Sequence, residues 1–431
     1  MGVSIAEETV EQADIEKAGG RILAILNDAM LALMVSVGHR TGLFDHLARS
    51  KPATTGDIAR MTEIEERYVR EWLSAMVVGG LVDHDPDSDT FRLEPALAGW
   101  LTRAAGPDNL AELAQFVSLL GNVEDEVVEC FREGGGVPYS SYPKFHEIMA
   151  EDSAQIHDAL LIDAIIPLGE GLMEALEDGI DVLDVGCGRG HSINLLARAF
   201  PGSSFTGIDI AEEALTVARA DGPGNALFEM MDAATLGGPE RYDLITAFDA
   251  IHDQAHPDLV LGGIHDSLRP GGTFLCGDIA ASSQVDDNRD HPLGAFFYTI
   301  STMHCMTVSL AQGGMGLGTM WGEQRAVEMM EKAGFNPVQV HHIEEDIASV
   351  YYVCHKSLTG PRPGGQRQVG FVRLVPQGGD TQKVLLLQFG LAHLGADILQ
   401  VTEKQNHRGQ WSVLEDERYL HRFSRCHRHL R

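Results

Sequence analysis

The stretch Asp181-Val-Leu-Asp-Val-Gly-Cys-Gly-Arg-Gly190 decides the fold of this chain. It begins as a short apolar run, typical of a buried strand, and ends in a loop with glycines at every second position. Apolar residues then recur over 193–200 at the spacing of a helix with one buried face. Glycine lets a backbone turn sharply and lets a ligand approach closely, and unpaired N–H groups at a helix start favour negative charge. The stretch therefore predicts a strand, a ligand-binding loop and a helix.

A second predicted strand, residues 204–210, places an acid, Asp209, at its carboxyl end. An acid in this position is suited to binding both hydroxyls of a ribose. The glycine spacing is not the G-x-G-x-x-G of dinucleotide folds, because the sixth position is His191. Asp184, two residues before the first glycine, is placed either to hold the loop or to contact an ammonium group of the ligand. Nicotinamide dinucleotides have no ammonium group, so a different nucleoside cofactor is expected.

Five segments in order carry a family resemblance. Residues 184–190 with Asp209 resemble the binding motif of class I S-adenosylmethionine-dependent methyltransferases. Residues 228–233, 242–249 and 268–275 resemble the third strand, the fourth strand and the turn into the fifth strand of that family. The order of all five segments makes the resemblance specific.

Regular alternation of strands and helices over 181–356 predicts an α/β domain, and the resemblance implies a doubly wound, mostly parallel seven-stranded sheet. Residues 337–343 and 348–355 are expected to close it as an antiparallel hairpin. The resemblance also implies S-adenosylmethionine as the cofactor. It assigns Gly186, Gly188 and Gly190 to the amino-acid moiety, Asp209 to the ribose, Asp232 to the adenine, and Phe248 and Asp249 to the neighbourhood of the sulfonium. Asp184, Ile210 and Ala233 are expected to be further cofactor-binding residues.

A candidate general base follows the fourth strand. Residues 250–256 resemble the same region of plant-type small-molecule O-methyltransferases, whose histidine before an aspartate is the base, which implies this role for His252. The sequence departs from that pattern at Gln254, where those enzymes have tryptophan, and the partner carboxylates are not identifiable. The alternative for His252 is a cap on the following helix. O-methylation is preferred because His252 offers a base; N- and C-methylation stay open, since such acceptors need only positioning.

Candidate residues for the acceptor pocket lie in two segments. The loop 134–142 carries Tyr142, and the apolar segment 296–310 carries Tyr298 and His304, the second candidate base; Trp321 follows a glycine-rich turn. Aromatic residues at helical spacing are also typical of an ordinary core.

Composition narrows the function classes. The chain has 431 residues and a formal net charge of −31, which suggests two or three domains and disfavours a nucleic-acid partner. No apolar run approaches the ~20 residues of a membrane span, so no membrane partner is expected. Six scattered cysteines without a C-x-x-C pair predict a reduced, cytoplasmic protein without a zinc site, and no metal is expected.

The regions around the methyltransferase domain have different compositions. Residues 1–19 are predicted to be flexible, and 20–104 to form a winged-helix domain of helices and a β-hairpin. Its second half mixes Arg67 and Arg70 with acids, which favours dimerisation, as in the resembling enzymes, over DNA binding. Residues 105–180 are expected to be a helical connector and lid, with a helix over 159–176. Residues 357–431 hold eleven Lys and Arg against six Asp and Glu and no sustained repeat, typical of a basic tail outside the fold.

The sequence thus predicts methyl transfer from S-adenosylmethionine to a small-molecule acceptor by a homodimer. Two alternatives come from other classes: a regulator or interaction protein with a catalytically silent methyltransferase domain, and a winged-helix DNA-binding protein. The acceptor itself cannot be named from the sequence.

Overall fold

A computed structural model describes residues 11–358 and the backbone of three later strands, residues 382–388, 398–405 and 411–414. The chain divides into two compact units, residues 1–360 and 361–431, each described here by itself. The tail residues His421, Cys426, His427 and His429, whose side chains are of types that can bind a metal, lie outside the described residues.

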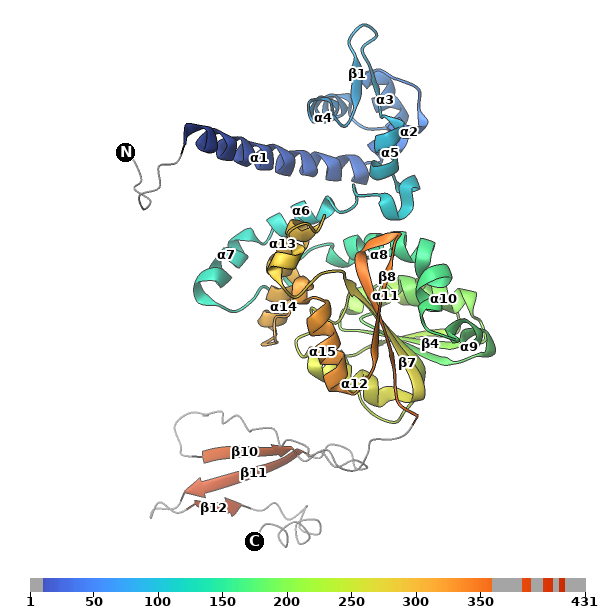
Figure 1. Cartoon of the computed structure of the whole chain (residues 1–431), viewed down its shortest axis with the longest axis vertical. Helices are drawn as coiled ribbons and strands as arrows, with labels where there is room; N and C mark the ends of the chain where they lie inside the picture. The colour runs from blue at the N-terminus through green and yellow to red at the C-terminus, as the bar shows by residue number, and fades with distance from the viewer. Residues whose placement is uncertain (1–10, 359–381, 389–397, 406–410, 415–431) are drawn as a thin grey trace. The chain divides into compact units, whose positions relative to one another are not determined.

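The N-terminal part is a small helical domain with a two-stranded wing, as predicted (Figure 1). Helix α3 begins where the Thr54 hydroxyl accepts a hydrogen bond from the Asp57 N–H at 3.3 Å, and α4 ends at Gly79. The core is built around Phe44 and Trp72, whose rings meet edge to face at 5.1 Å. The elements are α1 (Gln12–Arg40), α2 (Leu43–Arg49), α3 (Thr55–Thr62), α4 (Glu66–Val78), β1 (Asp83–Asp85), β2 (Thr90–Arg92), α5 (Pro95–Leu101) and η1 (Arg103–Asp108).

Helix α1 leaves much of its apolar surface exposed. Leu23, Leu26 and Met30 are 63%, 59% and 66% exposed. The helix is long and apolar enough to cross a membrane by length and composition alone, with a mean hydropathy of 1.7 in its most apolar window and 17% of that window buried. The same properties suit a helix that packs on another protein chain.

The connector differs from the prediction of one helix over 159–176. Helix α8 runs on to a π-helical turn, and the chain then breaks at Pro167, Gly169 and Gly171 before α9. Proline lacks the N–H that a helix interior needs, and glycine favours the left-handed turn found at Gly171 (φ 76°). The elements are α6 (Gln115–Gly121), α7 (Glu124–Glu133), η2 (Tyr139–Ser141), α8 (Phe145–Leu160), η3 (Leu161–Ile165), η4 (Ile166–Leu168) and α9 (Leu172–Asp178).

The central sheet confirms the predicted α/β fold. Its seven strands lie in the order β5-β4-β3-β6-β7-β9-β8; β9 is antiparallel to both β7 and β8, and the other neighbours are parallel. The strands are β3 (Asp181–Val185), β4 (Ser204–Asp209), β5 (Ala226–Met230), β6 (Tyr242–Phe248), β7 (Leu268–Ile279), β8 (Val338–Ile343) and β9 (Asp346–His355). The strand order reverses between β4 and β6 on either side of β3, and such a switch point is where α/β sheets bind ligands.

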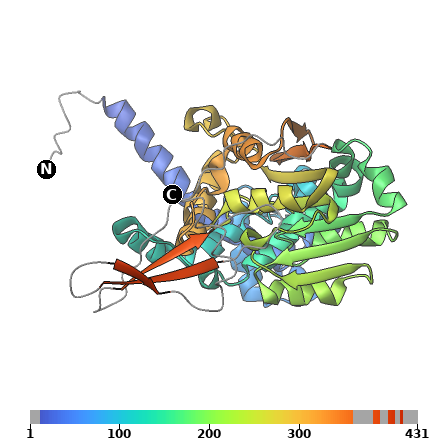
Figure 2. The ribbon, with the colours of Figure 1, turned by 90° about the horizontal axis from the view of Figure 1, so that it is seen from below.

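Helices cover both faces of this sheet (Figures 1 and 2). Alternate residues of one strand enter different cores: Leu183 and Ile245 belong to one, Val182 and Leu244 to the other. The helices and short turns between the strands are α10 (His191–Ala199), α11 (Glu212–Asp221), η5 (Ala233–Thr235), α12 (Pro257–Ser267), η6 (Val285–Asn288), α13 (Gly294–Ile300), η7 (Ser301–Cys305), α14 (Met306–Ala311), η8 (Thr319–Trp321) and α15 (Glu323–Ala333).

The second unit contains a three-stranded antiparallel sheet, β10 (Gln382–Gln388), β11 (Ile398–Gln405) and β12 (Trp411–Leu414). The sequence of the tail shows no sustained strand pattern, and the expectation that it lacks regular secondary structure is wrong. Strands of four to eight residues have too few alternations to stand out in a mixed composition.

Candidate cofactor and acceptor site

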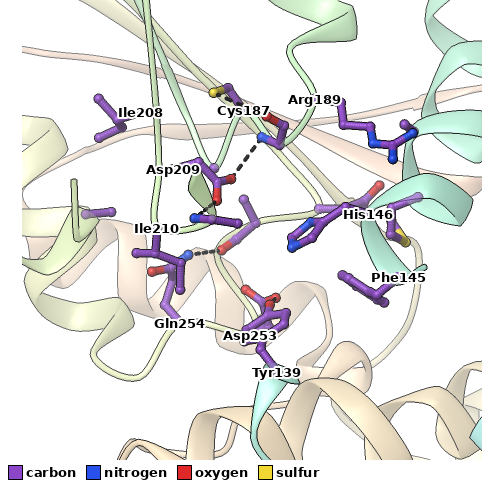
Figure 3. Close-up of a pocket in the computed structure, with 18 of the residues that line it drawn as sticks. Tyr139, Phe145, His146, Cys187, Arg189, Ile208, Asp209, Ile210, Asp253 and Gln254 are labelled. Carbon is purple, nitrogen blue, oxygen red and sulfur yellow. Dashed lines mark hydrogen bonds between the residues drawn. The ribbon is translucent and has the colours of Figure 1, made fainter. Parts of the chain in front are cut away.

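A cavity of about 590 Å³ opens at the carboxyl ends of β3, β4 and β6. The glycine loop after β3 forms one wall, and the segment from Tyr139 into α8 forms the wall opposite. The loop 253–256 after β6 closes the end between them (Figure 3). The cavity therefore lies at the switch point of the sheet, where the sequence placed the cofactor.

Asp209 connects the glycine loop to the second strand. Its Oδ2 accepts a hydrogen bond from the Gly188 N–H at 2.9 Å, and its Oδ1 accepts one from the Ala211 N–H at 2.8 Å (Figure 3). Gly188 has a φ of 52°, and a Cβ added there would meet no atom within 4 Å. The space beside Gly188 is thus open for a ligand, and the Asp209 carboxylate is fixed at its edge.

The glycines of this loop have different roles. Gly186 and Gly188 line the cavity, whereas Gly190 does not. A Cβ at Gly190 would lie 2.7 Å from the Ala218 Cβ and 2.9 Å from the Phe228 ring. Gly190 is required for packing α10 against its neighbours, so the structure does not bring it to the ligand.

Asp184 lies beneath the loop, almost fully buried. Its Oδ1 accepts a hydrogen bond from the Thr246 hydroxyl at 2.7 Å. Burial raises the pKa of Asp184 to about 7, with a further contribution from the charge of Asp209, although the Thr246 hydrogen bond opposes the rise. A cationic group bound in the cavity would favour the ionised form of this carboxyl.

The remaining predicted cofactor residues also line the cavity: Ile210, Asp232, Ala233, Phe248 and Asp249. The Asp232 Oδ1 accepts the Ala234 N–H at 2.9 Å, which fixes this carboxylate at the rim. Asp249 has a left-handed φ of 49°, and its buried Oδ1 has no hydrogen-bond partner among the described residues. Burial and the nearby Asp278 raise the pKa of Asp249 well above its ordinary value. Strain and an unpaired polar atom together mark Asp249 as a residue shaped for a ligand.

His252 lies directly behind this end of the cavity and does not line it. Its Nδ1 is 2.8 Å from Oδ1 of Asp278, and both side chains are buried. Burial alone would lower the pKa of His252, but the Asp278 carboxylate and the Cys305 thiol outweigh it, and the pKa is raised well above its ordinary value. His256, not His252, occupies the N-cap of α12, so the helix-cap alternative is wrong.

Of the residues assigned to the acceptor pocket, Tyr142 lines the cavity and Tyr298, His304 and Trp321 do not. Trp321 belongs to the core beside β7 and α15. The Tyr298 hydroxyl accepts a hydrogen bond from Asn288 at 3.1 Å. His304 is buried under Phe145, with the ring centroids 3.8 Å apart, and burial lowers its pKa to about 3. Trp321 is therefore a core residue, Tyr298 is held by Asn288 outside the cavity, and His304 is covered by Phe145.

Three features of the site are not predicted by the sequence. Asp278 pairs with His252, and Tyr139 donates a short hydrogen bond to Asp253 (Figure 3). Phe145 and His146, at the start of α8, line the cavity opposite the glycine loop. Asp278 could have been suspected, since it is an acid near the carboxyl end of a buried strand. Nothing in the local sequence of Tyr139 indicates its partner.

Two protein families match parts of this chain. Residues 29–103 match a winged helix-turn-helix domain of the Rv2258c-like type, and residues 176–334 match a methyltransferase domain. The second match covers strands β3 to β7, the glycine loop and the loop that carries His252, and ends before β8 and β9. Residues 176–334 therefore form a methyltransferase domain, and residues 29–103 form a winged helix-turn-helix domain before it.

Individual relatives cover smaller parts. The chain is 34% identical over 118 residues to a trans-aconitate 2-methyltransferase of Variovorax paradoxus, which is 27% of this chain and 42% of that protein. It is 33% identical over 103 residues to a fatty-acid O-methyltransferase of Mycolicibacterium smegmatis, 23% of this chain and 38% of the relative. The chain thus spans about two fifths of the length of these relatives.

The fold as a whole resembles human N-acetylserotonin methyltransferase, solved in complex with S-adenosylmethionine. The TM-score with the human structure is 0.57, at 17% identity, and the match covers 82% of this chain and 100% of the human chain. An O-methyltransferase family protein of Burkholderia thailandensis gives a TM-score of 0.56. At this identity the likeness establishes the shared fold of the two domains.

Proposed function

We propose that this protein transfers a methyl group from S-adenosylmethionine to a hydroxyl group of a small-molecule acceptor. The observation that carries the proposal is the joint geometry of the cavity: an open glycine loop, the fixed Asp209 carboxylate and the strained Asp249 share one site. S-adenosylmethionine supplies an electrophilic methyl group on a sulfonium. Asp209 would hold the ribose, Asp232 the adenine, and Asp184 the ammonium group of the cofactor.

The general base of this proposal is His252. If Nδ1 donates its proton to Asp278, Nε2 carries the lone pair that takes the acceptor proton. The carboxylate fixes the tautomer and raises the basicity of the ring. Since His252 lies behind the cavity wall, the acceptor hydroxyl must reach it through a rearrangement of the lid residues that cover His304.

The proposal is tested first by calorimetric titration of the full chain with S-adenosylmethionine and S-adenosylhomocysteine. Saturable binding of both is expected. A screen of acceptors with detection of S-adenosylhomocysteine then measures turnover. His252→Ala should abolish turnover and leave the cofactor affinity within about threefold of wild type; turnover that survives the substitution would contradict the base assignment.

A second candidate function is a regulator or interaction protein with a silent methyltransferase domain. The burial of His252 behind the cavity wall favours it. Cofactor binding with no turnover on any acceptor would select this candidate, whereas turnover would exclude it.

A third candidate, DNA binding through the winged-helix domain, has less support. Arg70 on α4 pairs with Glu66 at 2.9 Å, and Arg67 pairs with Glu71. These arginines are partly neutralised by acids on the same helix, so they offer little charge to a phosphate backbone. Retarded migration of DNA fragments by the full chain at 150 mM salt (about the physiological value) would overturn this judgement.

The proposed assembly is a homodimer in the cytoplasm. The exposed apolar side chains of α1 give a surface for a second copy, and the five cysteines among the described residues are unpaired, which suits a reducing compartment. Light scattering of the full chain should give twice the mass of the monomer, and the Leu26→Glu variant, changed on α1, should have the mass of a monomer.

A further inference from the structure

The acceptor end of the cavity is centred on one carboxylate. Asp253 lies at the closed end, and its Oδ2 accepts a hydrogen bond from the Tyr139 hydroxyl, which comes from the lid segment (Figure 3). Among the described residues, no side chain or backbone group donates to Oδ1 of Asp253. One oxygen of the carboxylate is thus held in place, and the other is available inside the cavity.

Aromatic rings surround this carboxylate. The ring of Tyr139 is parallel to that of His146, with an interplanar angle of 8° and centroids 6.2 Å apart, and it meets Phe145 edge to face at 5.8 Å. Tyr139 thus brings an aromatic cluster to Asp253, which is itself partly buried. Hydrogen bonds to a charged acceptor are stronger in such a setting than in water.

The charged side chains that line the cavity are mainly acidic. Asp and Glu supply seven of the lining side chains, while Lys and Arg supply two, Lys144 and Arg189. Lys144 is exposed at the mouth, and Arg189 belongs to the glycine loop at the cofactor end. Neither pairs with Asp253 in the described part of the chain. His252, a cation when protonated, acts on Asp253 from behind the cavity wall, but it is already paired with Asp278. A carboxylate placed next to Asp253 would therefore meet a like charge without a free cation to compensate it.

We infer that the methyl acceptor carries no carboxylate near its reacting end and binds by donating an O–H or N–H group to Oδ1 of Asp253. This inference rests on the proposed methyl transfer and narrows its substrate to compounds without a negative charge near the methylated group. Trans-aconitate and fatty acids, which name two of the relatives, fall outside that class. Asp253 is then an acceptor-binding residue, separate from His252.

The test compares matched small molecules on the full chain saturated with S-adenosylhomocysteine. The probes are catechol against 3,4-dihydroxybenzoate and tyramine against tyrosine, together with trans-aconitate, and binding is measured by ligand-observed NMR. We expect each compound without a carboxylate to bind at least tenfold more tightly than its carboxylated partner. Preferred or equal binding of the carboxylates would overturn the inference.

Three variants separate recognition by Asp253 from a general effect on the cavity. Asp253→Asn keeps the shape but removes the charge, so catechol and tyramine should bind about tenfold more weakly and the discrimination against carboxylates should shrink. Asp258→Asn makes the same chemical change in the first turn of α12, outside the cavity, and should leave that discrimination intact. Tyr139→Phe retains the carboxylate, so the preference should persist.

The failures are distinguishable. If S-adenosylhomocysteine does not bind, the proposed function itself is contradicted. If it binds and no probe distinguishes Asp253→Asn from wild type, only the present inference is overturned.

Discussion

The two glycines Gly188 and Gly190 offer a sharp test of the site, because alanine should affect them in opposite ways. Both have left-handed backbones, with φ of 52° and 75°. An alanine in this conformation costs about 1 kcal/mol at either position. At Gly188 the added Cβ enters open space in the cavity, whereas at Gly190 it lies 2.7 Å from the Ala218 Cβ.

The magnitudes follow from these contacts. Gly190→Ala adds overpacking of about 1–3 kcal/mol to the conformational cost, so the free energy of unfolding should fall by about 2–4 kcal/mol. Gly188→Ala should lower it by only about 1 kcal/mol. Because its methyl group occupies space meant for the cofactor, Gly188→Ala should weaken S-adenosylhomocysteine binding at least tenfold, about 1.4 kcal/mol.

Urea unfolding and calorimetric titration measure the two quantities separately. The variants serve as controls for each other, since both carry the same backbone cost. The reasoning would be refuted if Gly190→Ala were as stable as Gly188→Ala. It would also be refuted if Gly188→Ala were folded and bound S-adenosylhomocysteine with wild-type affinity.

Three further predictions concern titratable groups. The pKa of His252 is raised well above its ordinary value, so its base form appears at higher pH than in a free imidazole. We therefore expect kcat/KM to rise with pH, and Asp278→Asn should move that rise to lower pH and slow the reaction; an unmoved profile would contradict the pairing. Burial and the nearby Asp152 raise the pKa of Glu112 to about 10, so the free energy of unfolding of the wild type falls as pH increases above the unfolded pKa of 4.5. Glu112→Gln should therefore raise Tm more at pH 8, which lies between the two pKa values, than at pH 5. Equal increases in Tm at both pH values would contradict the raised pKa of Glu112. The hydrogen bond from His39 lowers the pKa of Glu151 to about 2 despite partial burial. The ionised Glu151 therefore stabilises the folded state above pH 4.5, and this stabilisation is lost as pH falls towards 2. The Tm difference between wild type and Glu151→Gln should narrow over this pH range, and a constant difference would contradict the pairing of Glu151 with His39.

Local sequence was sufficient for the fold class and for most of the residues that line the cavity at the carboxyl ends of the strands. The glycines at 186 and 188 and the acids at the ends of β3 and β4 line one cavity, as predicted. Two rules made this possible: glycine spacing sets the loop conformation, and parallel strands bring their carboxyl ends to one edge. The break of the connector at Pro167 could also have been read from the sequence, because proline ends helices locally.

The acceptor side depended on tertiary structure. Asp278 is 26 residues from His252, and Tyr139 is 114 residues from Asp253. Such pairs meet only after the strand order and the path of the lid are fixed, and no period in the sequence encodes them. Tyr298 and Trp321 are aromatic, as many pocket residues are, yet neither lines the cavity. Trp321 lies in the core and Tyr298 contacts Asn288, because an aromatic side chain suits other packed environments as well as a ligand site. The sequence by itself therefore determined the nucleotide-binding scaffold, and the long-range packing of the lid against the loop after β6 decided which side chains face an acceptor.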